Sequence, residues 1–329
     1  MPEVRQRQKS LGLSFAGGGV RALGEYAVFE ELEKQGIKVN AVSGTSMGAF
    51  LAAGVALGLN AEELHKLTVD IDQAIHESGL FRSRAIMHIF TLPKPFALVT
   101  MEKLAEVLKP HLHGLSETML SEVPLPLALT SVDLVSGKLI IFANKPEYFR
   151  AVFSDSEFYP EDILLSEAVL ASCAYPVVLS PVSLGDYQLA DGGLRLNSPA
   201  LLFNRDKVEY ILASGVKREN HRKPAEGPMD IAWRAISIVI QQQNEQGEEN
   251  ADARYSVDMD IASLFSFGQG QEVMAAGRSY VGQNPLHLEG LYEEILIPDE
   301  LAPPPAQTTA KARKKGFWKR LAEAFQPES

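Results

Sequence analysis

The sequence contains a single cysteine and no long apolar run. These two features limit the compartment and the class of protein to which the chain can belong. Cys173 has no partner for an internal disulfide, which favours a reducing compartment. No stretch approaches the ~20 apolar residues that a membrane-spanning helix requires. The charged first ten residues do not resemble a secretory signal. We therefore expect a cytoplasmic protein.

Basic residues are also scarce relative to acidic ones. The chain has 31 Lys and Arg against 42 Asp and Glu, a net charge of −11, which argues against nucleic acid as a partner. The exception is the segment 311–320, with six basic residues and no acidic one. At 329 residues, 46% of them apolar, the chain is long enough for one large domain or at most two.

Segments typical of strands and helices alternate from the start of the chain. An apolar strand at 11–16 precedes a helix at 20–35, and a second strand at 39–43 precedes an apolar helix at 49–57. This alternation predicts an α/β fold of three layers, α/β/α, with a mainly parallel central sheet. Further along, we predict strands at 125–133, 138–142, 187–190 and 208–213, and helices at 61–75, 102–112, 166–174, 231–243 and 272–281.

Other stretches have no clear period. Residues 80–99 mix apolar, basic and proline residues and are interpreted as a loop or lid, and the polar stretch 246–254 is predicted to be mobile. Ser166 is the expected N-cap of its helix. Prolines at 303–305 begin a linker, so we predict a globular domain over 10–302 and a separate tail over 303–329.

The segment Gly44-Thr45-Ser46-Met47-Gly48 matches the pattern G-x-S-x-G of a nucleophile elbow. Glycines on either side of the serine allow a sharp turn and let a substrate approach the hydroxyl. The segment lies between an apolar strand and an apolar helix, which is where this chemistry requires it. Ser46 is therefore the candidate nucleophile, and a purely structural glycine-rich turn is the alternative.

A serine nucleophile needs a base. An α/β-hydrolase uses a late histidine and has several strands before its elbow, whereas here one strand precedes Ser46. Only His221 and His287 of the seven histidines lie late in the chain, and neither has a recognisable motif around it. Asp191, at a strand end and followed by two glycines, is the better candidate, although an Asp-Gly pair is also a common turn.

A third glycine-rich segment, Gly17-Gly18-Gly19-Val20-Arg21, separates the first strand from its helix. Its free N–H groups could hold an oxyanion or a phosphate. Gly17, Gly19 and Ala22 also satisfy the dinucleotide pattern G-x-G-x-x-A. That interpretation needs an acidic residue at the end of the next strand, which instead runs into Ser43-Gly44. No G-K-[ST] follows, which excludes a P-loop.

Together, Gly-Gly-Gly-x-Arg at 17–21, Gly-Thr-Ser-Met-Gly at 44–48 and Asp-Gly-Gly at 191–193 resemble the patatin-like phospholipases. Residues 126–137, 171–176 and 197–199 resemble further segments of that family. The resemblance covers roughly residues 10–285.

The resemblance implies a serine lipid acyl hydrolase without metal or organic cofactor. Ser46 would attack an ester carbonyl of a lipid or phospholipid, forming an acyl-Ser46 intermediate, and Asp191 would take its proton. Arg21 would support the glycine-rich loop or meet a substrate phosphate. The implied oxyanion hole consists of the amides of Gly17, Gly18, Gly19 and Val20. The rival hypothesis is a catalytically weak or inactive lipid- or nucleotide-binding protein on the same fold.

Two features bear on the proposed dyad. Ala22 stands where the family usually has glycine, and its methyl group is expected to narrow the pocket beside the oxyanion loop. An ordinary carboxylate, with a pKa near 4, is also a poor base for a hydroxyl. The dyad therefore requires Asp191 to be desolvated and close to Ser46, because both conditions raise its basicity.

The C-terminal segment 311–325 has an aromatic face among basic residues. This pattern suits peripheral contact with an anionic membrane surface, on the cytoplasmic side. A docking helix or a solvated tail is the alternative. The predicted contact residues are Lys311, Lys314, Lys315, Phe317, Trp318, Lys319, Arg320 and Leu321.

Overall fold

The computed structural model describes residues 3–81, 97, 99–112, 114–217, 224–225, 227–259 and 264–297. The C-terminal segment with its predicted membrane contacts, and most of the segment 80–99, lie outside the described residues. Within the described ranges, no helix is both long and apolar enough to cross a bilayer. The chain divides into a small unit, Met1–Arg7 with residues from Tyr292 onward, and a large unit, Gln8–Leu291.

The small unit contains a strand pair that the sequence pattern did not predict. Strand β1 (Glu3–Gln8) is hydrogen-bonded to β11 (Tyr292–Ile297). Arg7 and Glu293 form an ion pair between the two strands at 2.5 Å. Both side chains are partly exposed, so this pair contributes little to stability.

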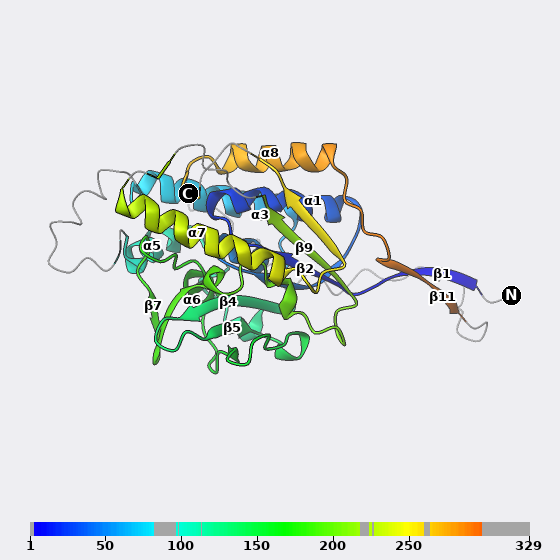
Figure 1. Ribbon diagram of the computed structural model, residues 1–329. Helices are drawn as coiled ribbons and strands as arrows, with labels where there is room; N and C mark the ends of the chain where they lie inside the picture. The colour runs from blue at the N-terminus through cyan, green and yellow to red at the C-terminus, as the bar shows by residue number, and fades with distance from the viewer. Residues whose placement is uncertain are drawn as a thin grey trace, which may run out of the picture. The chain divides into compact units, whose positions relative to one another are not determined.

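The large unit is built on a nine-stranded sheet (Figure 1). Strands β10, β9, β2, β3 and β4 are neighbours in this order and all run parallel, whereas β5 and β8 are antiparallel to β4. The predicted α/β fold with a mainly parallel sheet is thus confirmed. The strands are β2 (Leu11–Phe15), β3 (Val39–Gly44), β4 (Leu127–Asp133), β5 (Leu139–Ala143), β6 (Glu157–Phe158), β7 (Val182–Leu184), β8 (Tyr187–Asp191), β9 (Tyr210–Val216) and β10 (Ala253–Val257).

Each face of the sheet carries its own core, because side chains alternate along the strands. Leu11, Leu13 and Phe15 of β2 point into the larger core, which the helices cover. Ile211 and Ala213 of β9 belong to a smaller core on the other face. That second face is covered by the 3-10 turns η6 (Gly192–Leu194) and η7 (Pro199–Leu202), against which α7 packs. The α-helices are α1 (Tyr26–Lys34), α2 (Met47–Ala56), α3 (Ala61–Ser78), α5 (Met101–Leu108), α6 (Leu165–Ser172), α7 (Pro228–Gly247) and α8 (Gly270–Gln283).

Three details of the prediction were wrong. The segment predicted as a helix over 20–35 begins as a 3-10 helix, η1 (Gly19–Glu25), and becomes α1 only at Tyr26. Ser166 lies inside α6, whose N-cap position is Leu164. The helix predicted over 231–243 extends to Gly247, and a strand that was not predicted, β10, begins at Ala253, so both elements enter the stretch 246–254. Strand β10 lies at the sheet edge, and its alternate residues Ala253, Tyr255 and Val257 pack in or against the larger core.

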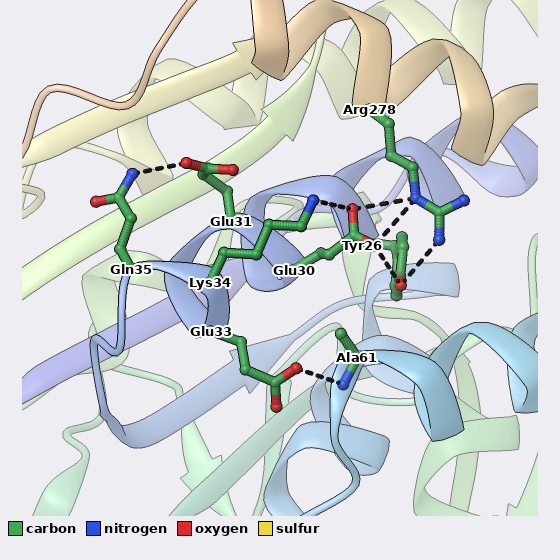
Figure 2. A network of polar contacts seen from close by, with 8 residues as sticks. All are labelled: Tyr26, Glu30, Glu31, Glu33, Lys34, Gln35, Ala61 and Arg278. Atoms are coloured by element: carbon green, nitrogen blue, oxygen red, sulfur yellow. Dashed lines mark hydrogen bonds and ion pairs between the residues drawn. The ribbon is translucent and has the colours of Figure 1, made fainter.

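Polar contacts hold α1 to both of its neighbouring helices (Figure 2). Arg278 of α8 donates to the carboxylate of Glu30 at 3.0 and 3.1 Å and to the hydroxyl of Tyr26 at 3.1 Å. The Arg278 guanidinium also lies over the Tyr26 ring. On the other side, Glu33 accepts from the N–H of Ala61, the first residue of α3. These contacts fix the helical layer that packs on β2 and β3.

Helix α8 approaches the 3-10 helix η1 so closely that only glycine fits at the contact. A methyl group at Gly277 would collide with the backbone carbonyl of Gly24. We predict that Gly277→Ala lowers the free energy of unfolding by about 1–3 kcal/mol, although alanine is the better helix former. Gly282→Ala on the same helix is the control, because a methyl group there meets nothing within 4 Å. Urea denaturation of the two variants checks this, and equal stabilities would contradict it.

Candidate active site

Two strands that meet end to end beside β4 bring the predicted nucleophile and base together. Strand β3 runs parallel to the first half of β4, with Gly44 opposite Leu129. Strand β8 runs antiparallel to the second half, with Asp191 opposite Ser131. Because β5 occupies the other edge of β4, β3 and β8 share one edge, and Thr130 alone separates their ends. The residues that follow Gly44 therefore face Asp191.

Ser46 sits at the sharp strand-to-helix turn that the sequence predicts. Its backbone is at φ 55° and ψ −129°, a conformation that non-glycine residues rarely adopt. A methyl group at Gly44 would lie 2.7 Å from Cβ of Ala52, and one at Gly48 would lie 2.5 Å from the carbonyl oxygen of Ala16. Both flanking glycines are thus required by close packing of the turn against α2 and the end of β2.

Hydrogen bonds of buried hydroxyl groups hold this turn against β4 and α6. Thr45 and Thr130 place their hydroxyl oxygens 2.6 Å apart, which ties the turn to β4. The N–H of Ser46 donates to Oγ of Ser172, the last residue of α6, at 2.9 Å. Ser131 donates to the carbonyl of Ala190, just before Asp191, at 2.6 Å. No sequence pattern predicted these hydroxyl groups, although Ser172 lies in a segment resembling the patatin-like family.

Asp191 is a buried carboxyl group with one oxygen that no geometric hydrogen bond occupies. Its side chain is 1% exposed, and Oδ1 accepts from the N–H of Gly193 at 2.8 Å. Oδ2 has no hydrogen-bond partner in the described part of the chain. Burial raises the pKa of Asp191 to about 6, while the nearby Ser46 hydroxyl and the N–H of Gly193 oppose this rise. The desolvation that a carboxylate base requires is therefore present.

The glycine-rich loop lies against Ser46. A methyl group at Gly17 would be 3.1 Å from Cβ of Ser46. The four amides predicted to face the oxyanion are not equivalent, however. Gly17 donates its N–H to Asn197, and Val20 donates to Leu264. The N–H groups of Gly18 and Gly19 have no acceptor among the described residues.

Asn197 connects the loop, the Asp191 turn and α7. Its Nδ2 donates to the carbonyl of Gly17 at 3.0 Å and to Oδ1 of Asn244 at 2.7 Å. A methyl group at Gly193 would lie 2.8 Å from Oδ1 of Asn197 and 3.0 Å from Oδ1 of Asp191. The sequence flagged Asn197 only by its resemblance to a family motif, and its bridging position becomes visible only in the fold.

Arg21 is among the residues that line the pocket at Ser46, whereas Ala22 is not. The guanidinium of Arg21 is buried and donates to the carbonyls of Lys217 and Met259 at 2.8 and 3.2 Å. These two bonds tie the glycine-rich loop to the segments that follow β9 and β10. Ala22 is fully buried and is not among the residues that line the pocket at Ser46. The expectation that its methyl group narrows this pocket is therefore wrong.

The histidine alternatives find no support in the described residues. His287 lies in a different hollow, beside β10, and His221 is outside the described residues. None of the described histidines lines the Ser46 pocket. Likewise, the described part of the chain contains no group of three or more His, Cys, Asp or Glu side chains arranged to hold a metal ion.

Ser46 and Asp191 open into a pocket that is partly open to solvent. One end is polar and contains the glycine-rich loop, Asn197 and Asn244. The remainder is mainly apolar and is lined by side chains from α2, α3, α5 and the segment before α8. These apolar residues are Met47, Phe50, Ile75, Phe81, Leu104, Leu108, Leu179, Leu264, Phe265 and Phe267.

The raised pKa of Asp191 predicts a pH-dependent stability. The folded state holds the Asp191 proton up to about pH 6, whereas the unfolded state loses it near 3.8. Ionisation of Asp191 therefore lowers stability as pH rises through this window, by up to about 3 kcal/mol. We expect Asp191→Asn to gain stability relative to the unmodified protein between pH 4 and pH 7, measured by urea denaturation.

Ser46→Ala serves as the control for this effect. It retains the buried carboxyl group and should keep the pH dependence of the unmodified protein. If the difference in stability between Asp191→Asn and the unmodified protein is the same at pH 4 and pH 7, the raised pKa of Asp191 is contradicted.

The comparisons with known proteins point to one family. The family model described as patatin-like phospholipase matches residues 13–204, which include the glycine-rich loop, the serine turn and Asp191. A "cGAMP-activated phospholipase" of Escherichia coli is 26% identical over 58% of this chain and 53% of its own length. An uncharacterized NTE family protein of Mycobacterium bovis is 27% identical over 64% of this chain.

The chain spans about half the length of the first relative and 31% of the length of the second. Among solved structures, VipD from Legionella pneumophila aligns with 88% of this chain and 68% of its own, at 14% identity and a TM-score of 0.45. Because the family model covers more than half of the residues, the chain belongs to the patatin-like phospholipase family.

Proposed function

We propose that this protein hydrolyses lipid acyl esters, with Ser46 as the nucleophile and Asp191 as the base. Membership of the patatin-like phospholipase family supports lipid acyl hydrolysis at the level of the family. The observation that carries the finer proposal is the buried carboxyl group of Asp191, with Oδ2 unpaired among the described residues, facing a serine on a strained turn.

In the proposed first step, Ser46 Oγ attacks the ester carbonyl carbon and its proton passes to Asp191 Oδ2. The N–H groups of Gly18 and Gly19 stabilise the oxyanion that forms, because such donors are typically worth about 3 kcal/mol each. The tetrahedral intermediate collapses to acyl-Ser46. The alcohol leaves with the proton that Asp191 returns.

In the second step, water attacks the acyl-Ser46 carbonyl and gives its proton to Asp191. The second tetrahedral intermediate releases the fatty acid and restores the Ser46 hydroxyl with the proton from Asp191. No other group is needed for proton balance. A carboxylate with a pKa near 6 is a stronger base than an ordinary aspartate, yet remains ionised at neutral pH.

The pocket supports an apolar acyl substrate, since its walls beyond the polar end are aliphatic and aromatic. Arg21 already binds two backbone carbonyls, so the proposal does not use it to hold a substrate phosphate. The rival hypothesis of an inactive lipid-binding protein shares this pocket and differs only in the chemistry at Ser46. The cytoplasmic location and the membrane contact through residues 311–321 stay predictions.

The proposal predicts a specific pH profile. Because Asp191 must be ionised to act as a base, kcat/KM for a water-soluble acyl ester should rise with pH, with a one-proton midpoint near 6, and then level off. Ser46→Ala and Asp191→Asn should each lower kcat/KM by about 10³-fold or more. The rate of hydrolysis is measured as the release of fatty acid, at pH values from 4.5 to 9.

His287→Ala is the matched control and should leave the rate and the profile unchanged, since His287 lies outside the Ser46 pocket. Full activity in Asp191→Asn would contradict the dyad. Absence of hydrolysis by the unmodified protein on short and long acyl esters and a phospholipid would favour the binding-protein hypothesis instead.

A further inference from the structure

We propose that the outer face of α7, formed by Ile231, Ile238 and Val239, rests on the surface of a zwitterionic lipid bilayer. This inference rests on the proposed acyl-ester function and goes beyond it by assigning the surface through which the protein reaches its lipid. It is separate from the contact predicted for residues 311–321. It follows from the two opposite sides of α7, one apolar and exposed, the other lining the Ser46 pocket.

Three large apolar side chains of α7 form an exposed stripe. Ile231, Ile238 and Val239 are 57, 50 and 46% exposed. Ala235, which is also exposed, lies between them in the sequence. Residues 231, 235, 238 and 239 follow the spacing i, i+4, i+7, i+8, which places them on one side of an α-helix. Single exposed apolar side chains are common in soluble proteins, but a continuous stripe of them marks a site of interaction.

The opposite side of α7 belongs to the candidate active site. Ser237, Ile240 and Asn244 line the pocket that contains Ser46, and the first two are buried. At 100° per residue, these positions point away from the exposed stripe, on the other side of the helix. In Figure 1, α7 lies on the near side of the sheet. One helix therefore has its inner side in the pocket and its apolar outer side in solvent.

The exposed stripe also reaches the surroundings of the pocket. Ile238 lines a surface hollow together with Val216, Lys217 and Asn244. The last three residues line the Ser46 pocket as well, and that pocket is partly open to solvent. The hollow beside Ile238 and the pocket are thus neighbours with shared walls.

A loop that packs on α7 adds another exposed apolar side chain. The hydroxyl groups of Tyr175 and Ser237 lie 3.3 Å apart, which brings this loop against the inner side of α7. Val177 lies between Tyr175 and Leu179, both of which line the Ser46 pocket. Val177 is exposed and has a φ of 72°, a strained conformation for a β-branched residue. Strain of this kind is typical of sites that bind a ligand.

The charge of the outer face determines which lipid surface it fits. Between Ile231 and Asn244, Arg234 is the only charged residue, and glutamines occupy 241–243. The whole chain has a net charge of −11, which opposes binding to an anionic surface. An uncharged apolar stripe instead suits a zwitterionic bilayer, where its side chains enter the interface without ion pairs. Membership of the patatin-like phospholipase family favours lipid over a second protein as the partner.

This placement gives a lipid a short path to Ser46. With the outer side of α7 on the bilayer, the pocket on its inner side lies about one helix diameter, ~10 Å, from the lipid surface. A lipid that leaves the bilayer beside α7 enters the pocket without exposing its acyl chains to bulk water, which would be unfavourable.

The test measures binding of the Ser46→Ala protein to phosphatidylcholine vesicles by co-flotation, so that binding is read without turnover. We expect the protein to bind and the binding to be unchanged by high salt, because the contact is apolar. Replacing Ile231, Ile238 and Val239 together by glutamine should weaken binding about 10²-fold, or about fivefold for each side chain, since roughly half of each is available for burial in lipid.

Val4→Gln is the matched control, because Val4 is 55% exposed and lies in the small unit. It should bind vesicles as the Ser46→Ala protein does. Glutamine is at least as good a helix former as isoleucine or valine, so the triple variant should keep its stability to urea. Ile238→Gln alone, with an expected loss of about fivefold, replaces the triple variant if that variant is unfolded.

Undiminished vesicle binding by the triple variant would overturn the inference. So would an equal loss in Val4→Gln, no binding by the Ser46→Ala protein, or binding only to vesicles that contain anionic lipid. Sedimentation equilibrium without lipid tests the alternative occupant. A dimer that the three glutamines dissociate would assign the outer face to a second copy of the chain and overturn the lipid contact.

These outcomes are separate from those of the proposed function, because binding is measured without Ser46. A protein that binds vesicles through α7 but hydrolyses no ester would refute the hydrolysis alone. With Ser46 restored, the triple variant should keep the kcat/KM of the unmodified protein on a water-soluble acyl ester, since none of the three residues lines the Ser46 pocket. A matching loss there would show a damaged pocket and contradict the inference.

Discussion

Strands β3 and β8 approach each other from opposite directions along one edge of β4, and the site depends on this contact. Each strand ends where the other would otherwise continue, with only Thr130 between their last pairing positions. The chain must turn away at both ends, and the two turns carry Ser46 and Asp191. The separation of Ser46 and Asp191 is thus set by backbone pairing and not by flexible side chains. In the proposed mechanism, one carboxyl group can therefore act without a histidine between it and the serine.

Both groups occupy positions that are unfavourable in isolation. Ser46 has a positive φ, and Asp191 keeps its carboxyl group out of water. Such features typically cost about 1–3 kcal/mol each, so the surrounding structure must hold them in place. Here the constraint comes from Gly44 and Gly48, where a methyl group would collide with neighbouring backbone atoms. Hydrogen bonds of buried hydroxyl groups also hold the turn in place. In the proposed mechanism, the burial that raises the pKa of Asp191 also makes it a better base.

Local sequence patterns predicted the fold class and the serine turn, because each depends on residue types close together in the chain. Asp191-Gly192-Gly193 is also a common turn motif, so the prediction of Asp191 as the base depended on the resemblance to the patatin-like family. Long-range contacts were not predictable in this way. Gly17 and Val20 belong to the glycine-rich loop, yet their N–H groups bind Asn197 and Leu264, far away in sequence. Ala22 looked like a pocket residue, but the turn of η1 directs it into the core. Strand β10 is short and lies at the edge of the sheet, so only its pairing with β9 reveals it.

The central claim is that Asp191 activates Ser46, and covalent labelling by an alkyl fluorophosphonate tests it most directly. Only an activated serine reacts with this reagent, and no assumption about the natural substrate is needed. We predict a single adduct on the peptide that contains Ser46, identified by mass spectrometry, and labelling at least about 10²-fold slower in Asp191→Asn. Failure of the unmodified protein to react, or equal rates in the two proteins, would contradict the account.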